Sequence, residues 1–145
     1  MQTQIPMPRT INDLVLDSLE RRPNSSVVRY RKEKTWLDIT GSELRERIRN
    51  LALALNKAGI KPGDRVAILA ESCPDWAIAD YAILMCGAVT VPIYPTQAVE
   101  QVGFILRDSA ARILFISNQK QLKRVQSAID SASGEAPRII VFDEK

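Results

Sequence analysis

Apolar residues spaced three and four positions apart predict two helices in the first part of the chain. The first runs from about Ile11 to Glu20, and the second begins after Thr40 and ends before Gly59, a good helix C-terminal cap. Each helix opens with a capping box, a threonine followed three residues later by an acidic residue. Between them, two short apolar runs flank the polar residues 32–34, which predicts an antiparallel β-hairpin of uncertain turn type.

From residue 65 onward, short apolar runs alternate with longer segments of helical spacing. The runs are predicted strands, the longer segments are predicted helices, and the strand that follows Arg65 is apolar at every position, as in a strand covered on both faces. The predicted strands are 65–70, 89–94, 112–117 and 138–142, and the predicted helices are 74–86, 99–107 and 120–129. Short connections imply right-handed crossovers. The predicted fold class is therefore α/β, a mainly parallel sheet with helices on both faces, preceded by a helix and a β-hairpin.

Length and composition exclude several classes of protein. The 145 residues, of which 46% are hydrophobic, are enough for one domain with a real core. The absence of histidine excludes a Ser-His-Asp triad, a Cys-His dyad and a typical His-bearing zinc site from this sequence. Cys73 and Cys86 are interpreted as small packing residues in a reducing compartment. Because we find neither a secretion signal nor a membrane-spanning apolar run, we expect a cytoplasmic location.

The net charge of +3 is unevenly distributed. Arg29, Arg31, Lys32 and Lys34 cluster in one segment, and the arginines at 45, 47 and 49 alternate in another. Because acidic residues interleave with these cations, a solvated face is the first interpretation. Loose peripheral contact with an anionic membrane surface is the alternative. Nucleic-acid binding is not expected, because the clusters lack the repeated aromatic residues on which bases stack.

The sequence offers little that could carry chemistry. A phosphate-binding loop needs converging backbone N–H groups and a nearby cation, but neither G-x-G-x-x-G nor G-x-x-x-x-G-K-[ST] occurs. The nearest candidate, Ser131-Ala-Ser-Gly134, is interpreted as a helix-to-strand connector. Asp80 is expected to be exposed or to make a structural hydrogen bond, and Trp76 is expected to pack in the core. No catalytic, cofactor-binding or metal-binding residue is assigned.

One short loop is a candidate site. Tyr94, Pro95 and Thr96 follow directly after a predicted buried strand. In open parallel sheets, ligands bind beyond the carboxyl ends of the strands. We therefore predict that these three residues form a substrate-side loop.

Five segments stand in a distinctive order and spacing: Trp36-Leu-Asp-Ile-Thr40, Gly59-Ile-Lys-Pro-Gly-Asp-Arg-Val-Ala-Ile-Leu69, Glu71-Ser-Cys-Pro-Asp-Trp76, Gly87-Ala-Val-Thr-Val-Pro-Ile-Tyr-Pro-Thr96 and 101–115. Together they resemble the opening part of AMP-forming acyl-CoA synthetases, over residues 10–143. Segment 87–96 resembles in particular the long-chain fatty-acid–CoA ligases of that family. Asp75, where the family has glutamate, and Gly41, where it often has an aromatic residue, are small departures.

The resemblance implies that residues 1–145 are the N-terminal portion of an AMP-binding domain. Members of the family use ATP, Mg and coenzyme A to convert a long-chain fatty acid into an acyl-CoA through an acyl-adenylate. Their phosphate loop, Mg-binding glutamate, ribose-binding aspartate and C-terminal lysine have no counterpart in this sequence. The 145 residues alone are therefore expected to be inactive and to hold no cofactor.

Two further expectations concern partners. If the chain is a piece of a longer ligase, it should pack against the remainder of the adenylate-forming domain, and the surface left bare should favour self-association. The alternative is a free-standing, non-catalytic α/β module that binds a partner protein or an acyl ligand.

Overall fold

The computed structural model describes residues 10–131 and 136–143. The chain folds as two compact units, one that ends at Arg47 and one that begins at Ile48. Helix α2, Gly41–Lys57, contains the boundary between them. In the part of the chain that is described, no helix is both long and apolar enough to cross a membrane.

The first unit contains the predicted helix and hairpin. Helix α1 spans Ile11–Arg21, and strands β1, Ser26–Lys32, and β2, Thr35–Thr40, pair antiparallel. Both predicted capping boxes are formed; at the start of α2, for example, the Thr40 N–H donates to the Glu43 carboxylate at 2.8 Å. The hairpin turn, whose type the sequence left uncertain, places Glu33 at φ 55°. A residue with a Cβ adopts this left-handed conformation at an energetic cost.

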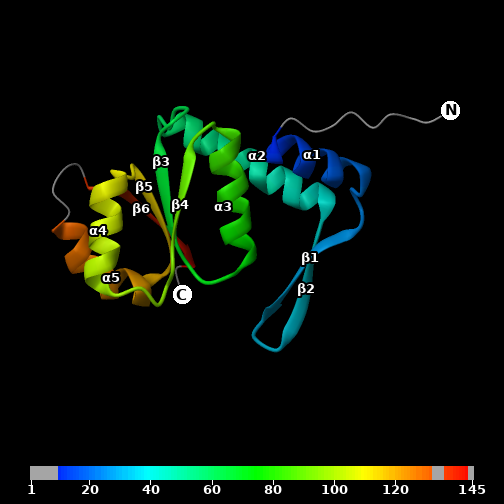
Figure 1. The fold of residues 1–145 in the computed structure, drawn as a ribbon. Coiled ribbons are helices and arrows are strands. Elements are labelled where there is room, and N and C mark those ends of the chain that lie inside the picture. Colours follow the sequence, from blue (N-terminus) through cyan, green and yellow to red (C-terminus); the bar gives the residue numbers. More distant parts are fainter. Residues whose placement is uncertain (1–9, 132–135, 144–145) are drawn as a thin grey trace. The chain divides into compact units, whose positions relative to one another are not determined.

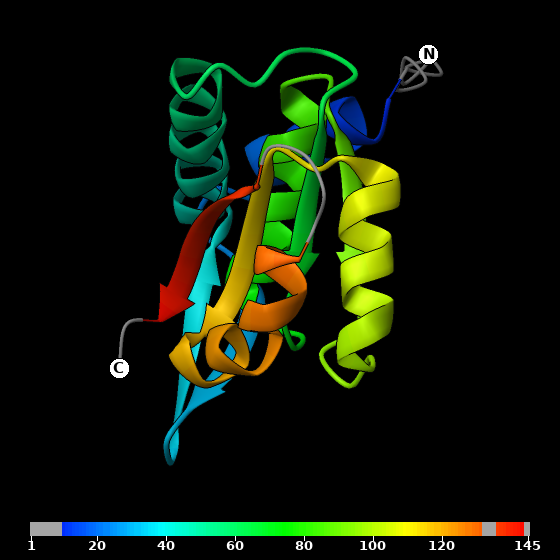
Figure 2. The same ribbon diagram turned by 90° about the vertical axis from the view of Figure 1, so that its left-hand side faces the viewer.

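The second unit is a four-stranded parallel sheet with the strand order β4-β3-β5-β6. Its elements are β3 Arg65–Leu69, α3 Pro74–Met85, β4 Val89–Ile93, α4 Val99–Ser109, β5 Ile113–Asn118, α5 Gln119–Asp130 and β6 Arg138–Asp143. Figure 1 and Figure 2 show α4 and α5 on one face of this sheet and α3 on the other. The predicted α/β class, with helices on both faces of a parallel sheet, is confirmed.

The core of the second unit has a layer on each face of the sheet. Alternate residues of β3 and β5, such as Leu69 and Leu114, pack with Val102 and Val125 of helices α4 and α5. Because successive side chains of a strand point to opposite faces, the intervening residues, such as Phe115, face α3. All of these side chains are buried. Burial on both faces explains why the central strands are apolar at nearly every position.

The two edges of this sheet differ in one backbone detail. Strand β4 lies at one edge and contains Pro92, which is registered opposite Ile68 of β3. Proline has no N–H to donate, so within sheets it occurs on edge strands. Strand β6 forms the other edge and has no proline.

Two glycines shape the connections at the amino ends of the strands. Gly59 has φ 88° and follows α2, where the Ile60 N–H bonds back to the Leu55 carbonyl. This confirms the predicted cap. Gly87 has φ 68°, and a Cβ added to it would lie 3.2 Å from Pro62. Both positions favour glycine, but only the second is also sterically crowded.

The predicted element boundaries differ from the observed ones by a few residues at most. The largest change at a strand start is in β5, which begins at Ile113 and not at Arg112. Residues 132–134 of the predicted connector, Ser131 to Gly134, lie outside the described part of the chain.

Candidate functional site

A hollow lies at the carboxyl ends of strands β3 and β4. Its volume is ≈ 640 Å³, which lies within the range of small-ligand pockets. We call it the strand-end hollow, and its lining residues are Ala70, Glu71, Ser72, Trp76, Pro92, Ile93, Tyr94, Pro95 and Thr96. The loop predicted from the sequence, Tyr94 to Thr96, thus forms one wall of this hollow.

The loop after β4 is held by side chains from α5. The Arg124 guanidinium donates to the carbonyl oxygens of Pro95 and Gln97, at 2.8 and 2.9 Å. The Gln121 amide nitrogen donates to the same Pro95 carbonyl at 3.3 Å, and the Arg124 Nε donates to the Gln121 side-chain oxygen at 2.7 Å. These contacts hold the backbone of the loop. The side chain of Tyr94 stays 76% exposed, free to meet a ligand.

Glu71 carries the acidic group of the hollow. Its Oε1 accepts a hydrogen bond from the Gln121 amide at 3.2 Å. Partial burial raises the pKa of Glu71, but hydrogen bonds from its own backbone N–H, Ser117 and Gln121, together with the charge of Arg124, outweigh this, so its pKa lies below the ordinary value. Glu71 is therefore ionised at neutral pH and suits a hydrogen-bond acceptor or a positioning group, and it is a poor general acid.

The hollow combines an apolar wall with a few polar groups. Trp76, Pro92 and Ile93 contribute apolar side chains to the lining, and Glu71, Ser72 and Thr96 contribute polar ones. This composition is typical of small-ligand sites, in which a few polar groups orient a largely apolar ligand. No group of three or more His, Cys, Asp or Glu side chains in the described residues is placed to hold a metal ion.

The structure changes the interpretation of two residues. Trp76, expected in the core, is half-buried and lines the hollow, because the first turn of α3 faces the strand ends. Glu71, which the sequence reasoning did not assign to a site, also lines it. One available signal could have found Glu71: it lies just beyond β3, as Tyr94 lies just beyond β4, so the same strand-end rule applies to both.

The remaining candidates have structural roles or none. Asp80 is half-buried and makes no side-chain hydrogen bond with the described residues. Cys86 is buried, and its Sγ–H donates to the Ala52 carbonyl at 3.4 Å. Burial raises the pKa of the Cys86 thiol, which keeps it protonated and unreactive. This confirms the interpretation of Cys86 as a packing residue.

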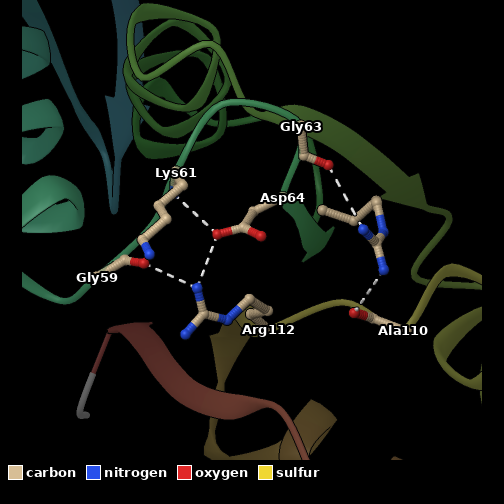
Figure 3. A network of polar contacts seen from close by, with 7 residues as sticks. Gly59, Lys61, Gly63, Asp64, Ala110 and Arg112 are labelled. Atoms are coloured by element: carbon tan, nitrogen blue, oxygen red, sulfur yellow. Dashed lines mark hydrogen bonds and ion pairs between the residues drawn. The ribbon is translucent and has the colours of Figure 1, made fainter.

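The opposite end of the sheet holds a second polar network, drawn in Figure 3. The Asp64 carboxylate accepts from the Lys61 N–H at 2.8 Å and from Arg112 at 2.7 Å, and Arg112 also donates to the Gly59 carbonyl. The bond from the Lys61 backbone, followed by that from Arg112, holds the pKa of Asp64 below its ordinary value.

Arg65 belongs to the same network. It donates to the carbonyl oxygens of Ser109 at 2.6 Å and of Ala110 at 3.4 Å. Ala110 itself is left-handed, with φ 46°. These polar groups therefore bind the connections of the protein itself, which gives them a structural role.

Comparison with known proteins places this fold in a family. The model of the family described as AMP-binding enzyme matches residues 16–144. The long-chain-fatty-acid–CoA ligase FadD15 of Mycobacterium bovis is 34% identical over 144 residues, which cover 95% of this chain and 23% of that protein. The chain therefore spans about a quarter of the length of this curated relative.

Solved structures show the same fold. The anthranilate CoA ligase AuaEII, solved with anthranoyl-AMP, superposes with a TM-score of 0.84 at 22% identity, over 97% of this chain and 26% of that one. A benzoate CoA ligase from Burkholderia xenovorans superposes with a TM-score of 0.79 at 22% identity, over 91% of this chain and 25% of that one. The matched fold, together with a family model that covers most of the sequence, leads to one conclusion: the chain belongs to the AMP-binding enzyme family.

Proposed function

We propose that this chain is the N-terminal part of the adenylate-forming domain of a long-chain fatty-acid–CoA ligase. The observation that carries the proposal is the similarity to FadD15 along 95% of the chain, which includes both strand-end segments. The complete enzyme would join a fatty acid to coenzyme A, with ATP converted to AMP and pyrophosphate through an acyl-adenylate. Its partner within the molecule is the remainder of that domain.

The strand-end hollow is the part of this chain that we assign to the substrate side. Its apolar wall at Trp76 suits a hydrocarbon group, and the hydrogen bonds from Arg124 keep the Tyr94–Gln97 loop in place beside it. Glu71 stays ionised there and can orient a hydrogen-bond donor. No reaction step is assigned to these residues, because none of them forms a recognisable acid-base or nucleophilic pair.

A chimera tests the proposed role. The region of FadD15 that matches this chain would be replaced by residues 1–145, and palmitoyl-CoA formation from palmitate, ATP, Mg and coenzyme A would be measured. We expect the chimera to retain activity, because the two sequences match along nearly the whole of this chain. A chimera that folds, as judged by a cooperative melting transition, but activates no fatty acid of any length contradicts the proposal.

The chain alone is proposed to be inactive. In the same assay, 145 residues without the rest of the domain should give no palmitoyl-CoA and no ATP hydrolysis above blank. Measurable acyl-CoA formation by the purified chain would overturn this part.

The second candidate is a non-catalytic module that binds an acyl ligand, and the mainly apolar wall of the hollow favours it. Calorimetric titration of the chain with palmitate separates the two functions. Saturable binding that Trp76→Ala weakens, together with an inactive chimera, would favour the module. An active chimera favours the ligase.

A further inference from the structure

The β1–β2 hairpin exposes apolar and cationic side chains together. Trp36 is 62% exposed, Val27 37% and Leu37 36%. A tryptophan that is mostly exposed is uncommon, because large aromatic side chains are highly buried on average. Its surroundings on the hairpin indicate what it could contact.

The hairpin register places cations beside this tryptophan. Arg31 is registered directly opposite Trp36, so their two side chains leave the same face of the two-stranded sheet. Lys32 comes next on β1, opposite Thr35, and Lys34 lies in the turn. Near the tip of the hairpin, Trp36 and Arg31 therefore share one face, whereas Lys32 leaves the other face and Lys34 lies beside Glu33 in the turn.

Most of these cations are not paired with an acidic side chain of the described residues. Arg29 forms an ion pair with Asp38 at 2.8 Å. Arg31, Lys32 and Lys34 form no ion pair with any described residue. Residues 26–40 hold four cations and two acids, so that the hairpin has a net charge of +2 (four minus two).

We propose that the tip of this hairpin docks on an anionic lipid membrane. Tryptophan is enriched at the membrane–water interface, where its ring meets the acyl boundary and its N–H stays in the headgroup layer. Nearby lysine and arginine side chains are attracted by anionic headgroups. One mostly exposed tryptophan flanked by unpaired cations suits a shallow interfacial contact that the cations reinforce. This inference does not depend on the proposed enzymatic function.

Cosedimentation with vesicles tests the charge contribution. The chain should bind vesicles of equal parts phosphatidylglycerol and phosphatidylcholine but not pure phosphatidylcholine, and high salt should release it. The triple variant Arg31→Gln, Lys32→Gln, Lys34→Gln should bind roughly a hundredfold more weakly, at about fivefold per cation.

The matched control removes the same charge elsewhere. It is the triple variant Arg45→Gln, Arg47→Gln, Arg49→Gln, and its binding should stay close to that of the unsubstituted chain. Equal losses in both variants, or no binding of the unsubstituted chain to anionic vesicles, would overturn the proposal. Circular dichroism checks that both variants are folded.

Fluorescence tests the tryptophan without changing the hairpin. In a Trp76→Phe background Trp36 is the only tryptophan, because the chain contains two. Its emission should shift to shorter wavelength with anionic vesicles and be quenched by brominated lipid, since the ring enters a less polar layer. An unchanged spectrum on bound vesicles, or an equal shift with a soluble polyanion such as heparin, would contradict membrane docking.

Discussion

The two ends of the parallel sheet use their polar groups in opposite ways. At the amino end, Asp64, Arg65 and Arg112 bind backbone groups and each other, and tie the connections together (Figure 3). At the carboxyl end, Arg124 holds only the backbone of the loop after β4, and the side chain of Tyr94 remains exposed beside a hollow. The polar groups of the amino end fix the connections there, whereas the carboxyl end leaves side chains exposed to a ligand.

This difference explains why a segment can resemble the family strongly and still offer few side chains to a ligand. Much of the distinctive segment 59–69 belongs to the amino end, where Gly59, Lys61 and Asp64 have structural contacts. The residues that follow β3 and β4 lie at carboxyl ends of strands, where ligands bind in such sheets. The following predictions test whether the two ends really divide stability and binding in this way.

The largest effect is expected at Gly87, at the amino end. Gly87→Ala should lower the free energy of unfolding by about 2 kcal/mol, because the left-handed conformation is strained for alanine and its Cβ meets Pro62. Gly59→Ala is the matched control, since its φ is also positive but nothing lies within 4 Å of the added Cβ. Its cost should be about 1 kcal/mol. Urea denaturation measures both values, and equal losses would show that crowding at Pro62 has no effect.

A smaller effect is expected when the carboxyl-end loop is released. Arg124→Ala removes the bonds to Pro95 and Gln97 and should lower the free energy of opening the loop by about 1 kcal/mol. This corresponds to about fivefold faster exchange of the Gln97 amide hydrogen. The Val89 amide, which bonds to the Asp64 carbonyl at the amino end, should exchange at an unchanged rate. Lys123→Ala removes an exposed neighbouring cation and is the control. Faster exchange at both amides would mean that the two ends are not independent.

Acid should weaken the amino end more than the carboxyl end. The pKa of Asp64 in the folded state lies below its unfolded value, so its stabilising contribution is complete above about pH 3.9 and is lost as the pH falls through the folded value. Asp64→Asn should therefore lower the melting temperature near neutral pH and make it less sensitive to acid.

The control for this acid effect is at the other end. Glu71 also has a lowered pKa, but its side chain is exposed, so Glu71→Gln should change the acid sensitivity less. Melting curves recorded across the acidic range measure both variants. A larger change in Glu71→Gln than in Asp64→Asn would contradict the assignment of the rigid network to the amino end.

The smallest effect on stability is expected at Tyr94. Because its side chain is 76% exposed, Tyr94→Ala should change the free energy of unfolding by no more than about 0.5 kcal/mol. In the FadD15 chimera the same substitution should raise the KM for palmitate, since the ring borders the hollow. A large loss of stability with an unchanged KM would mean that Tyr94 is a structural residue.

Local patterns predicted the fold but only part of the site. The apolar run that begins at Val66 and the caps at Thr40 and Gly59 depend on neighbours within a few positions, so periodicity was sufficient for them. Tyr94 was proposed as a site residue because a simple rule connects strand ends with ligands; it lines the hollow, and its role in binding stays a prediction. The position of Trp76 was predicted wrongly, because helical spacing does not tell which turn of a helix faces the strand ends. The contact of Arg124 with Pro95 joins residues 29 positions apart, and no local pattern encodes it.

Pro92 makes the two edges of the sheet unequal as sites for a further strand. A strand that added to the free side of β4 would meet a position with no hydrogen to offer, so an incoming backbone would lack one bond in its ladder. Strand β6 contains no proline and therefore lacks no backbone N–H. A further strand, whether from the same polypeptide or from a second copy, would therefore form fewer hydrogen bonds at β4 than at β6, and Pro92 makes edge-to-edge aggregation at β4 less favourable.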